Sequence, residues 1–349
     1  MLRSFLVFLA LSLTLGRTCW PQSSPVPAAD YTVARSWRIG GTAPWDNLAL
    51  QENGARLFVS RTDHVDVIDT KTGKLLATIP HTQGVHDVAF AAALNRGFTS
   101  NAGANTVSVF ELDTLRVIQE LAVTGTHPDS ILYEPQHNYI VTANRESANL
   151  TVFDAGALKS IATVALPGPP ESLASDAAGH LYVNIKSAPG KLVLIDTKSL
   201  AVKAKWPLKD CANPTALSFD IVNHRLFSIC ANQTLAVTDS VSGKAIARIV
   251  IGRGADGIGY DPDFDLLFSA NGIDGTLTVI HQDSPDEYRV LASVNTQVSA
   301  RTMVLDPASH RVYMAAAQFG PPPSGSGELP AQHASILPDS FIILVAQPK

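Results

Sequence analysis

Seven polar residues recur along the chain at intervals of forty-odd residues and could share one site. Carboxylate oxygens beside an imidazole could hold a hard or borderline divalent cation, or supply a general base for hydrolysis of a polar ester. Alternatively, such side chains would only hydrate the rim of a channel and pair with backbone N–H groups. The seven residues are Asp46, His86, Asp129, Glu171, Thr215, Asp256 and Arg301.

Two short His–Asp motifs give the sharpest local cluster among these positions. One is His86-Asp87 and the other is His127-Pro128-Asp129. Neither motif has metal-ligand spacing within its own loop, so any shared site must be assembled by the fold. We therefore name His86, Asp129 and Asp256 as candidate ligands of a divalent cation, predict no other cofactor, and assign no single catalytic residue.

Common catalytic motifs are missing from the sequence. It contains no Cys-x-x-Cys-His, no His-Glu-x-x-His and no Gly-x-Ser-x-Gly nucleophile motif. The segment 252–257 resembles a phosphate-binding loop, but no helical pattern follows it to supply N-terminal amides. Attached c-type haem and nucleophilic serine catalysis therefore find no support.

A hydrophobic strand pattern explains the spacing of the polar residues. Each repeat consists of four short apolar runs separated by turn residues, and helical periodicity is nowhere sustained. In the first repeat the expected strands are 47–50, 57–60, 65–69 and 75–79. The third strands end at equivalent positions 42 or 43 residues apart, namely Asp69, Glu111, Asp154, Asp196, Asp239 and His281. A terminal Asp there is expected to hydrogen-bond the backbone of the following turn.

Four strands in every repeat of this length predict an all-β fold, a seven-bladed β-propeller. The last repeat stops after its third strand, so the segment 31–39 should complete it and close the ring. In a propeller, the loops that enter the inner strands share a face, which places the seven polar residues at one channel mouth. Four histidines fall in turns on the opposite face and are expected to be exposed there: His137, His180, His224 and His310.

The seventh repeat is interrupted by an insertion, residues 318–339, rich in Pro, Gly and Ser. It lies between the second and third strands of that repeat, so it should emerge on the mouth face. A long loop in a compact fold is usually functional or disordered, and the sequence leaves both open.

The N-terminal segment carries an export pattern. Arg3 precedes the apolar run 5–15, which is too short to span a bilayer. We expect a signal peptide at 1–20, a linker at 21–30, a single propeller domain at 31–349, no transmembrane segment in the mature chain, and a periplasmic or secreted location. Cys211 and Cys230 would then be the remaining cysteines, either joined in a disulfide or packed as separate buried thiols.

Composition restricts the partners. The formal charge is −5 with 26 basic and 31 acidic side chains, and no window is rich in Lys and Arg, so no nucleic acid is expected. Charged residues make up 16% and apolar residues 46%, which suits many buried strands. We expect a monomer that binds an unidentified protein or a small polar ligand.

The repeat resembles the YVTN-type repeat of YncE-like seven-bladed β-propellers. The resemblance lies in Leu-Tyr-Val-Asn at 181–184, Tyr-Ile-Val-Thr-Ala-Asn at 139–144, Val-Asp-Val-Ile-Asp at 65–69 and Leu-Val-Leu-Ile-Asp at 192–196, and extends over about 31–346. It implies a propeller and says little about activity, because related propellers include exported binding proteins and, more distantly, lactonases and domains of redox enzymes.

Three function classes remain open from the sequence. The main expectation is a non-catalytic binding or scaffold module that uses the channel-mouth face. The alternative is a lactonase-like hydrolase with a divalent cation at the carboxylate ring. Accessory roles in redox assemblies, with the cofactor on another chain, are a third class.

Overall fold

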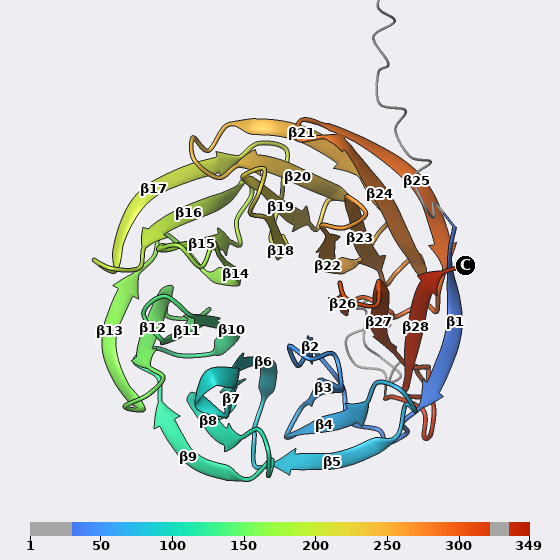
Figure 1. Cartoon of the computed structure of the whole chain (residues 1–349), viewed down its shortest axis with the longest axis horizontal. Coiled ribbons are helices and arrows are strands. Elements are labelled where there is room, and N and C mark those ends of the chain that lie inside the picture. Colours follow the sequence, from blue (N-terminus) through green and yellow to red (C-terminus); the bar gives the residue numbers. More distant parts are fainter. Residues whose placement is uncertain (1–29, 322–334) are drawn as a thin grey trace, which may run out of the picture.

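Seven four-stranded antiparallel sheets form a closed ring around a central channel in the computed structural model (Figure 1). The structure describes residues 30–321 and 335–349. The all-β, seven-bladed prediction is confirmed. The expected signal peptide and nearly all of the expected linker lie outside the described residues, as does the middle of the insertion.

Each of the first six blades consists of four consecutive strands, ordered from the channel outward. Blade 1 contains β2 (Leu48–Leu50), β3 (Arg56–Arg61), β4 (His64–Asp69) and β5 (Leu75–Pro80). Blade 2 contains β6 (Val85–Ala91), β7 (Arg96–Asn101), β8 (Thr106–Glu111) and β9 (Val117–Ala122), with a 3₁₀ turn, η1 (Ala92–Leu94), between β6 and β7. Blade 3 contains β10 (Pro128–Glu134), β11 (Tyr139–Asn144), β12 (Asn149–Asp154) and β13 (Lys159–Ala165).

The remaining blades keep the same order. Blade 4 contains β14 (Pro170–Ser175), β15 (His180–Ile185), β16 (Gly190–Asp196) and β17 (Ala201–Leu208). Blade 5 contains β18 (Pro214–Asp220), β19 (Arg225–Cys230), β20 (Thr234–Asp239) and β21 (Ala245–Val250). Blade 6 contains β22 (Ala255–Asp261), β23 (Leu266–Asn271), β24 (Thr276–Ser284) and β25 (Glu287–Asn295).

Blade 7 joins the two ends of the chain. Its order is β26 (Met303–Asp306), β27 (Arg311–Ala316), β28 (Ile342–Pro348) and then β1 (Tyr31–Arg38), which pairs antiparallel with β28. The N-terminal strand therefore supplies the outermost strand of the last blade, as its incomplete repeat predicts. Tyr31 also packs edge-on against Phe268 of blade 6, with 4.8 Å between ring centroids, so closure ties β1 to two blades.

Side chains between adjacent blades form the core. The middle strands of every blade are buried on both faces, for example Leu57, Val67, Val109 and Val193, which have no exposed surface. This explains why these strands are continuous apolar runs in the sequence.

A buried asparagine at the end of the second strand hydrogen-bonds polar side chains of the second and third strands in several blades. Asn144 is fully buried, accepts a hydrogen bond from Thr142 at 3.1 Å and donates to Asn149 at 2.7 Å and Thr151 at 2.8 Å. Asn101 and Asn271 make the equivalent contacts in blades 2 and 6. The repeated Asn is therefore a structural residue that satisfies buried polar groups.

The acids that end the third strands cap turns, as expected. The carboxylate of Asp69 accepts hydrogen bonds from the backbone N–H groups of Lys71 and Thr72 at 3.1 and 2.7 Å. Asp154, Asp196 and Asp239 accept equivalent bonds in their own blades. The side-chain bond from Thr72, followed by the backbone bonds, lowers the pKa of Asp69.

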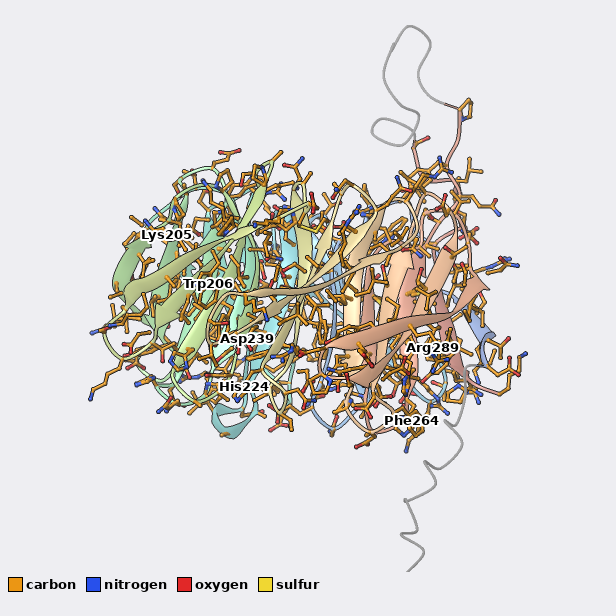
Figure 2. The ribbon with its side chains drawn as sticks, turned by 90° about the horizontal axis from the view of Figure 1, so that it is seen from above. Lys205, Trp206, His224, Asp239, Phe264 and Arg289 are labelled. Atoms are coloured by element: carbon orange, nitrogen blue, oxygen red, sulfur yellow. A yellow bond between two sulfur atoms is a disulfide. The ribbon has the colours of Figure 1, made fainter. Side chains whose placement is uncertain are left out.

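The four turn histidines lie on the face opposite the channel mouth, but only two are exposed. Figure 2 shows the ring from the side, with His224 and Phe264 on that lower face. His180 and His224 are exposed, whereas His137 and His310 are half-buried because they brace neighbouring blades. His310 stacks on Phe264 with 3.9 Å between centroids and contacts Asp261 of blade 6 at 2.8 Å. The expectation of exposure was therefore wrong for His137 and His310.

The two cysteines of blade 5 form a disulfide, which is one of the two alternatives that the sequence left open. The bond joins Cys211 and Cys230 across the β18–β19 hairpin, with Cα atoms 5.2 Å apart. Where the insertion begins and ends, Phe319 and Ile336 form an isolated β-bridge, and Phe319 packs against Trp45 beside the channel mouth, 6.1 Å between centroids. No helix among the described residues is long and apolar enough to cross a membrane.

Candidate functional site at the channel mouth

A β-bulge at the start of the inner strand places a polar residue at the channel mouth in five blades. The ladder between β6 and β7 skips one residue between Val85 and Asp87, and the skipped residue is His86. Blades 5 and 6 likewise skip one residue, Thr215 and Asp256, whereas blades 3 and 4 skip two, Asp129-Ser130 and Glu171-Ser172. Bulges redirect side chains in this way, and they are frequent beside active sites.

A left-handed residue precedes most of these bulges by two positions. Gly84 and Gly254 adopt φ of 65° and 70°, which glycine tolerates without cost. His127, Asn213 and Ser299 adopt φ of 58°, 47° and 88° at the equivalent positions. The two blades without such a residue carry Pro44 and Pro169 there. The conformation of the turn before each inner strand therefore fixes the backbone position of the mouth residue.

Ion pairs link the mouth residues in a chain of alternating charge. Asp46 of blade 1 accepts a short hydrogen bond from Nδ1 of His86, whose same nitrogen lies 3.4 Å from Asp129. On the other side of Asp46, Arg301 lies 3.8 Å from it and 3.2 Å from Asp256. The sequence-predicted residues of blades 1, 2, 3, 6 and 7 are thus brought together.

Two basic residues extend this chain and were missed from the sequence. Arg145 lies 2.5 Å from Asp129 and 3.0 Å from Glu171, and Lys186 lies 2.6 Å from Glu171. Both follow directly after second strands, in loops that share the mouth face. Their position after Asn144 and Ile185 was a usable signal, because only blades 3 and 4 carry a cation immediately after the second strand.

Blade 5 interrupts the charged chain. The Thr215 hydroxyl donates to the backbone carbonyl of Ala255 at 3.1 Å and meets no charged partner among the described residues.

His127 lies beside His86, with 5.2 Å between ring centroids, and its buried Nε2 has no hydrogen-bond partner in the described part of the chain. Burial, His86 and Arg145 lower the pKa of His127.

A cavity of about 250 Å³ opens between the bulges. The charged residues that line it are five acids, Asp46, Asp87, Asp129, Glu171 and Asp256, and one base, Arg145. Apolar side chains of the inner strands, including Leu173 and Met303, line it further in. The cavity lining is therefore strongly acidic, and His86, Lys186 and Arg301, which do not line it, pair with lining acids.

Two lining carboxyl groups have pKa values near neutrality. Burial raises the pKa of Asp256 to about 6, against the opposing effect of Arg301. Its side chain nevertheless keeps 32% of its surface accessible, so water reaches it from the channel. Burial likewise raises the pKa of Asp87 to about 7, although the N–H groups of Val88 and Ile131 donate to it. Carboxyl groups with such values can exchange protons at neutral pH.

One group at the mouth could hold a cation. Ligand atoms of Asp46, His86 and Asp129 lie within 4.8 Å of one another. Burial disfavours a charged His86, but the hydrogen bond to Asp46 and the charge of Asp129 outweigh it and raise the pKa of His86. Asp256, which the sequence placed with His86 and Asp129 as a candidate ligand, pairs with Arg301 instead. The structure thus replaces Asp256 by Asp46 in this group.

Comparisons with known proteins support the propeller fold. A family model described as lactonase, 7-bladed β-propeller, matches residues 48–169, which cover blades 1 to 3 and include His86 and Asp129. No curated protein sequence matches the chain. Among solved structures, a chain of Kuenenia stuttgartiensis hydrazine synthase is similar with a TM-score of 0.70 and 16% identity, covering 78% of this chain and 92% of that one. That likeness concerns the fold alone. The narrower resemblance to YVTN-type propellers stays a prediction.

Proposed function

We propose that this protein hydrolyses small cyclic esters at its channel mouth. The observation that carries the proposal is Asp256, a water-accessible carboxyl group on the wall of the cavity, with a pKa raised to about 6 and a guanidinium 3.2 Å away. The match of blades 1 to 3 to a lactonase family supports the reaction class. The expected binding role of the mouth becomes substrate binding in this proposal.

The chemistry requires a base, an oxyanion donor and a proton for the leaving oxygen. Ionised Asp256 takes a proton from water as the water oxygen attacks the ester carbonyl carbon. Nε and Nη2 of Arg145, the one cation on the cavity wall, pair with Glu171 and Asp129, and its Nη1 N–H groups can donate to the oxyanion of the tetrahedral intermediate. When the ring C–O bond breaks, the proton on Asp256 passes to the departing ring oxygen, and a hydroxy acid leaves with Asp256 regenerated.

A screen of five- and six-membered lactones tests this proposal. We expect ring opening above the spontaneous rate and a loss of about 10²–10⁴-fold in Asp256→Asn, because the amide cannot accept a proton. Asp263→Asn, on the opposite face, is the matched control and should retain full activity. Equal turnover in both variants, or no turnover by the wild-type protein on any lactone, would contradict the proposal.

A divalent cation is a further proposed component of the mouth. Asp46, His86 and Asp129 offer two carboxylates and an imidazole, a set suited to a borderline ion such as Zn²⁺. Such an ion would polarise an ester carbonyl. Metal analysis of protein purified without chelator should find about one equivalent, lost in His86→Gln and retained in His224→Gln, a variant of an exposed turn residue on the opposite face. Retention of the metal in His86→Gln would show that the ion binds elsewhere. Metal-free wild-type protein would contradict the proposal of a bound cation.

We also propose that the protein is exported. The Cys211–Cys230 disulfide supports this location, since disulfides persist mainly in oxidising compartments. Fractionation of cells, with detection of the processed N-terminus by mass spectrometry, tests it. Unprocessed protein in the reducing cytosol would refute it.

A further inference from the structure

The charges around the cavity restrict the substrate beyond its ester group. The charged part of the cavity wall is made of five acids and a single base, Arg145. An anionic substituent on a ligand would therefore face carboxyl groups from blades 1, 2, 3, 4 and 6. Like charges repel across a few ångströms even where solvent partly screens them.

The cations near the cavity are already neutralised. Arg145 is shared between Asp129 and Glu171, Lys186 is held by Glu171, and Arg301 contacts Asp256 and Asp46. Further out on the same face, Arg253 contacts Asp274 at 2.7 Å. Lys209 lines a separate groove beside β17 and β21. No cation lining or adjoining this cavity in the described residues is without a carboxylate partner.

The insertion does not alter this balance. Residues 322–334 contain no Lys or Arg, and their single acidic residue is Glu328. Whatever their position, these residues bring no permanent positive charge to the mouth.

We infer that the mouth selects uncharged, hydroxylated cyclic esters and discriminates against phosphorylated or carboxylated ones. The wall carboxylates accept hydrogen bonds from substrate hydroxyl groups, and the break in the charged chain at Thr215 leaves an uncharged side for the rest of the ring. This inference rests on the proposed function, since it names the substrate class of that site.

Glu171 is the residue that enforces this discrimination. It is 9% exposed and occupies both Arg145 and Lys186. Replacing its charge while keeping its shape leaves Lys186 without a carboxylate partner and Arg145 with Asp129 only. The variant Glu171→Gln should therefore open an anion-binding position at blades 3 and 4.

Paired kinetics test the inference. The probes are an uncharged aldonolactone and the same lactone carrying a terminal phosphate. In wild-type protein we expect kcat/KM to be at least about tenfold higher for the uncharged lactone, and the ratio should shrink as salt screens the carboxylates. In Glu171→Gln the ratio should fall by about tenfold or more.

The control is Glu146→Gln on the same face. Glu146 is an exposed acid whose one ion-pair contact in the described chain is His127 at 3.5 Å, so the same charge is removed without releasing Arg or Lys. Its ratio should stay near the wild-type value. Wild-type preference for the phosphorylated lactone, or equal shifts in the two variants, would overturn the inference. Absence of hydrolysis of either lactone would instead refute the proposed function.

Discussion

Asp256 and Arg301 show how neighbouring blades tune a single group. Asp256 is the bulged residue of blade 6, and Arg301 enters from the loop before β26 of blade 7. Burial raises the pKa of the carboxyl group, while the guanidinium opposes that rise. The pair keeps the carboxyl group close to the pH at which a base is most effective.

Removing the guanidinium should therefore move the titration of Asp256. In Arg301→Gln the opposing effect is lost, so the pKa of Asp256 should rise above its value of about 6. The acid limb of kcat/KM for lactone hydrolysis should shift to higher pH. Arg253→Gln, whose partner is Asp274, is the matched control and should leave the limb in place. A shift to lower pH in Arg301→Gln would contradict this pairing.

The repeat positions indicated which residues lie at the channel mouth, but not which of these residues contact one another. Aligning the repeats placed Asp46, His86 and Asp129 on one mouth, and they are adjacent because consecutive blades are neighbours. The sequence could not show that Asp256 turns toward Arg301, since that depends on side-chain direction at a bulge. Arg145 and Lys186 were missed because they come from a different loop of each blade.

In blades 2, 3 and 6 the mouth residue is supported by polar contacts as well as apolar packing. The residue just before the bulge pairs with the buried Asn that ends the second strand, which is Asn101, Asn144 or Asn271. In blade 3, Asn144 pairs with Pro128, next to Asp129, so the Asn network supports the bulge. Strand bounds agreed with the predicted ones within about two residues, except that β24 continues three residues past His281 to Ser284, because apolar runs and turn residues alternate so regularly.

Loss of this asparagine should destabilise blade 3. Asn144→Ala leaves Thr142, Asn149 and Thr151 without their shared partner, which should lower the free energy of unfolding by about 1–3 kcal/mol. Gln119→Ala, on the exposed surface of β9, should change it by less than about 0.5 kcal/mol. Urea denaturation of both variants measures the difference. Equal stability of the two would show that the network contributes little.

The closed ring is what turns seven separate residues into one site. Closure was predictable because the last repeat lacks a fourth strand and the N-terminal segment supplies one, and β1 pairs with β28 as expected. The fully buried Arg61 reinforces the junction between blades 1 and 7, since it lies over the Phe341 ring at 3.7 Å and contacts Asp66 at 3.1 Å. A buried pair of this kind depends on both partners, because a lone charge there would be unpaired.

Five acids from five blades line the cavity that the ring creates, and four of them are paired with His86, Arg145, Lys186 or Arg301, of which only Arg145 lines the cavity itself. This arrangement holds carboxyl groups close together in a buried place, where they would otherwise repel one another. Burial at this place raises the pKa of Asp256 to about 6 and that of Asp87 to about 7. The ring thereby supplies a proton acceptor at neutral pH without a dedicated catalytic motif in the sequence.

The pH dependence of lactone hydrolysis tests the central claim most directly. Because ionised Asp256 is the base, kcat/KM of the wild-type protein should rise with pH through about 6 and level off above it. Residual hydrolysis by Asp256→Asn should lack that limb. An unchanged limb near pH 6 in Asp256→Asn, together with wild-type turnover, would show that another group activates water and that the assignment of Asp256 is wrong.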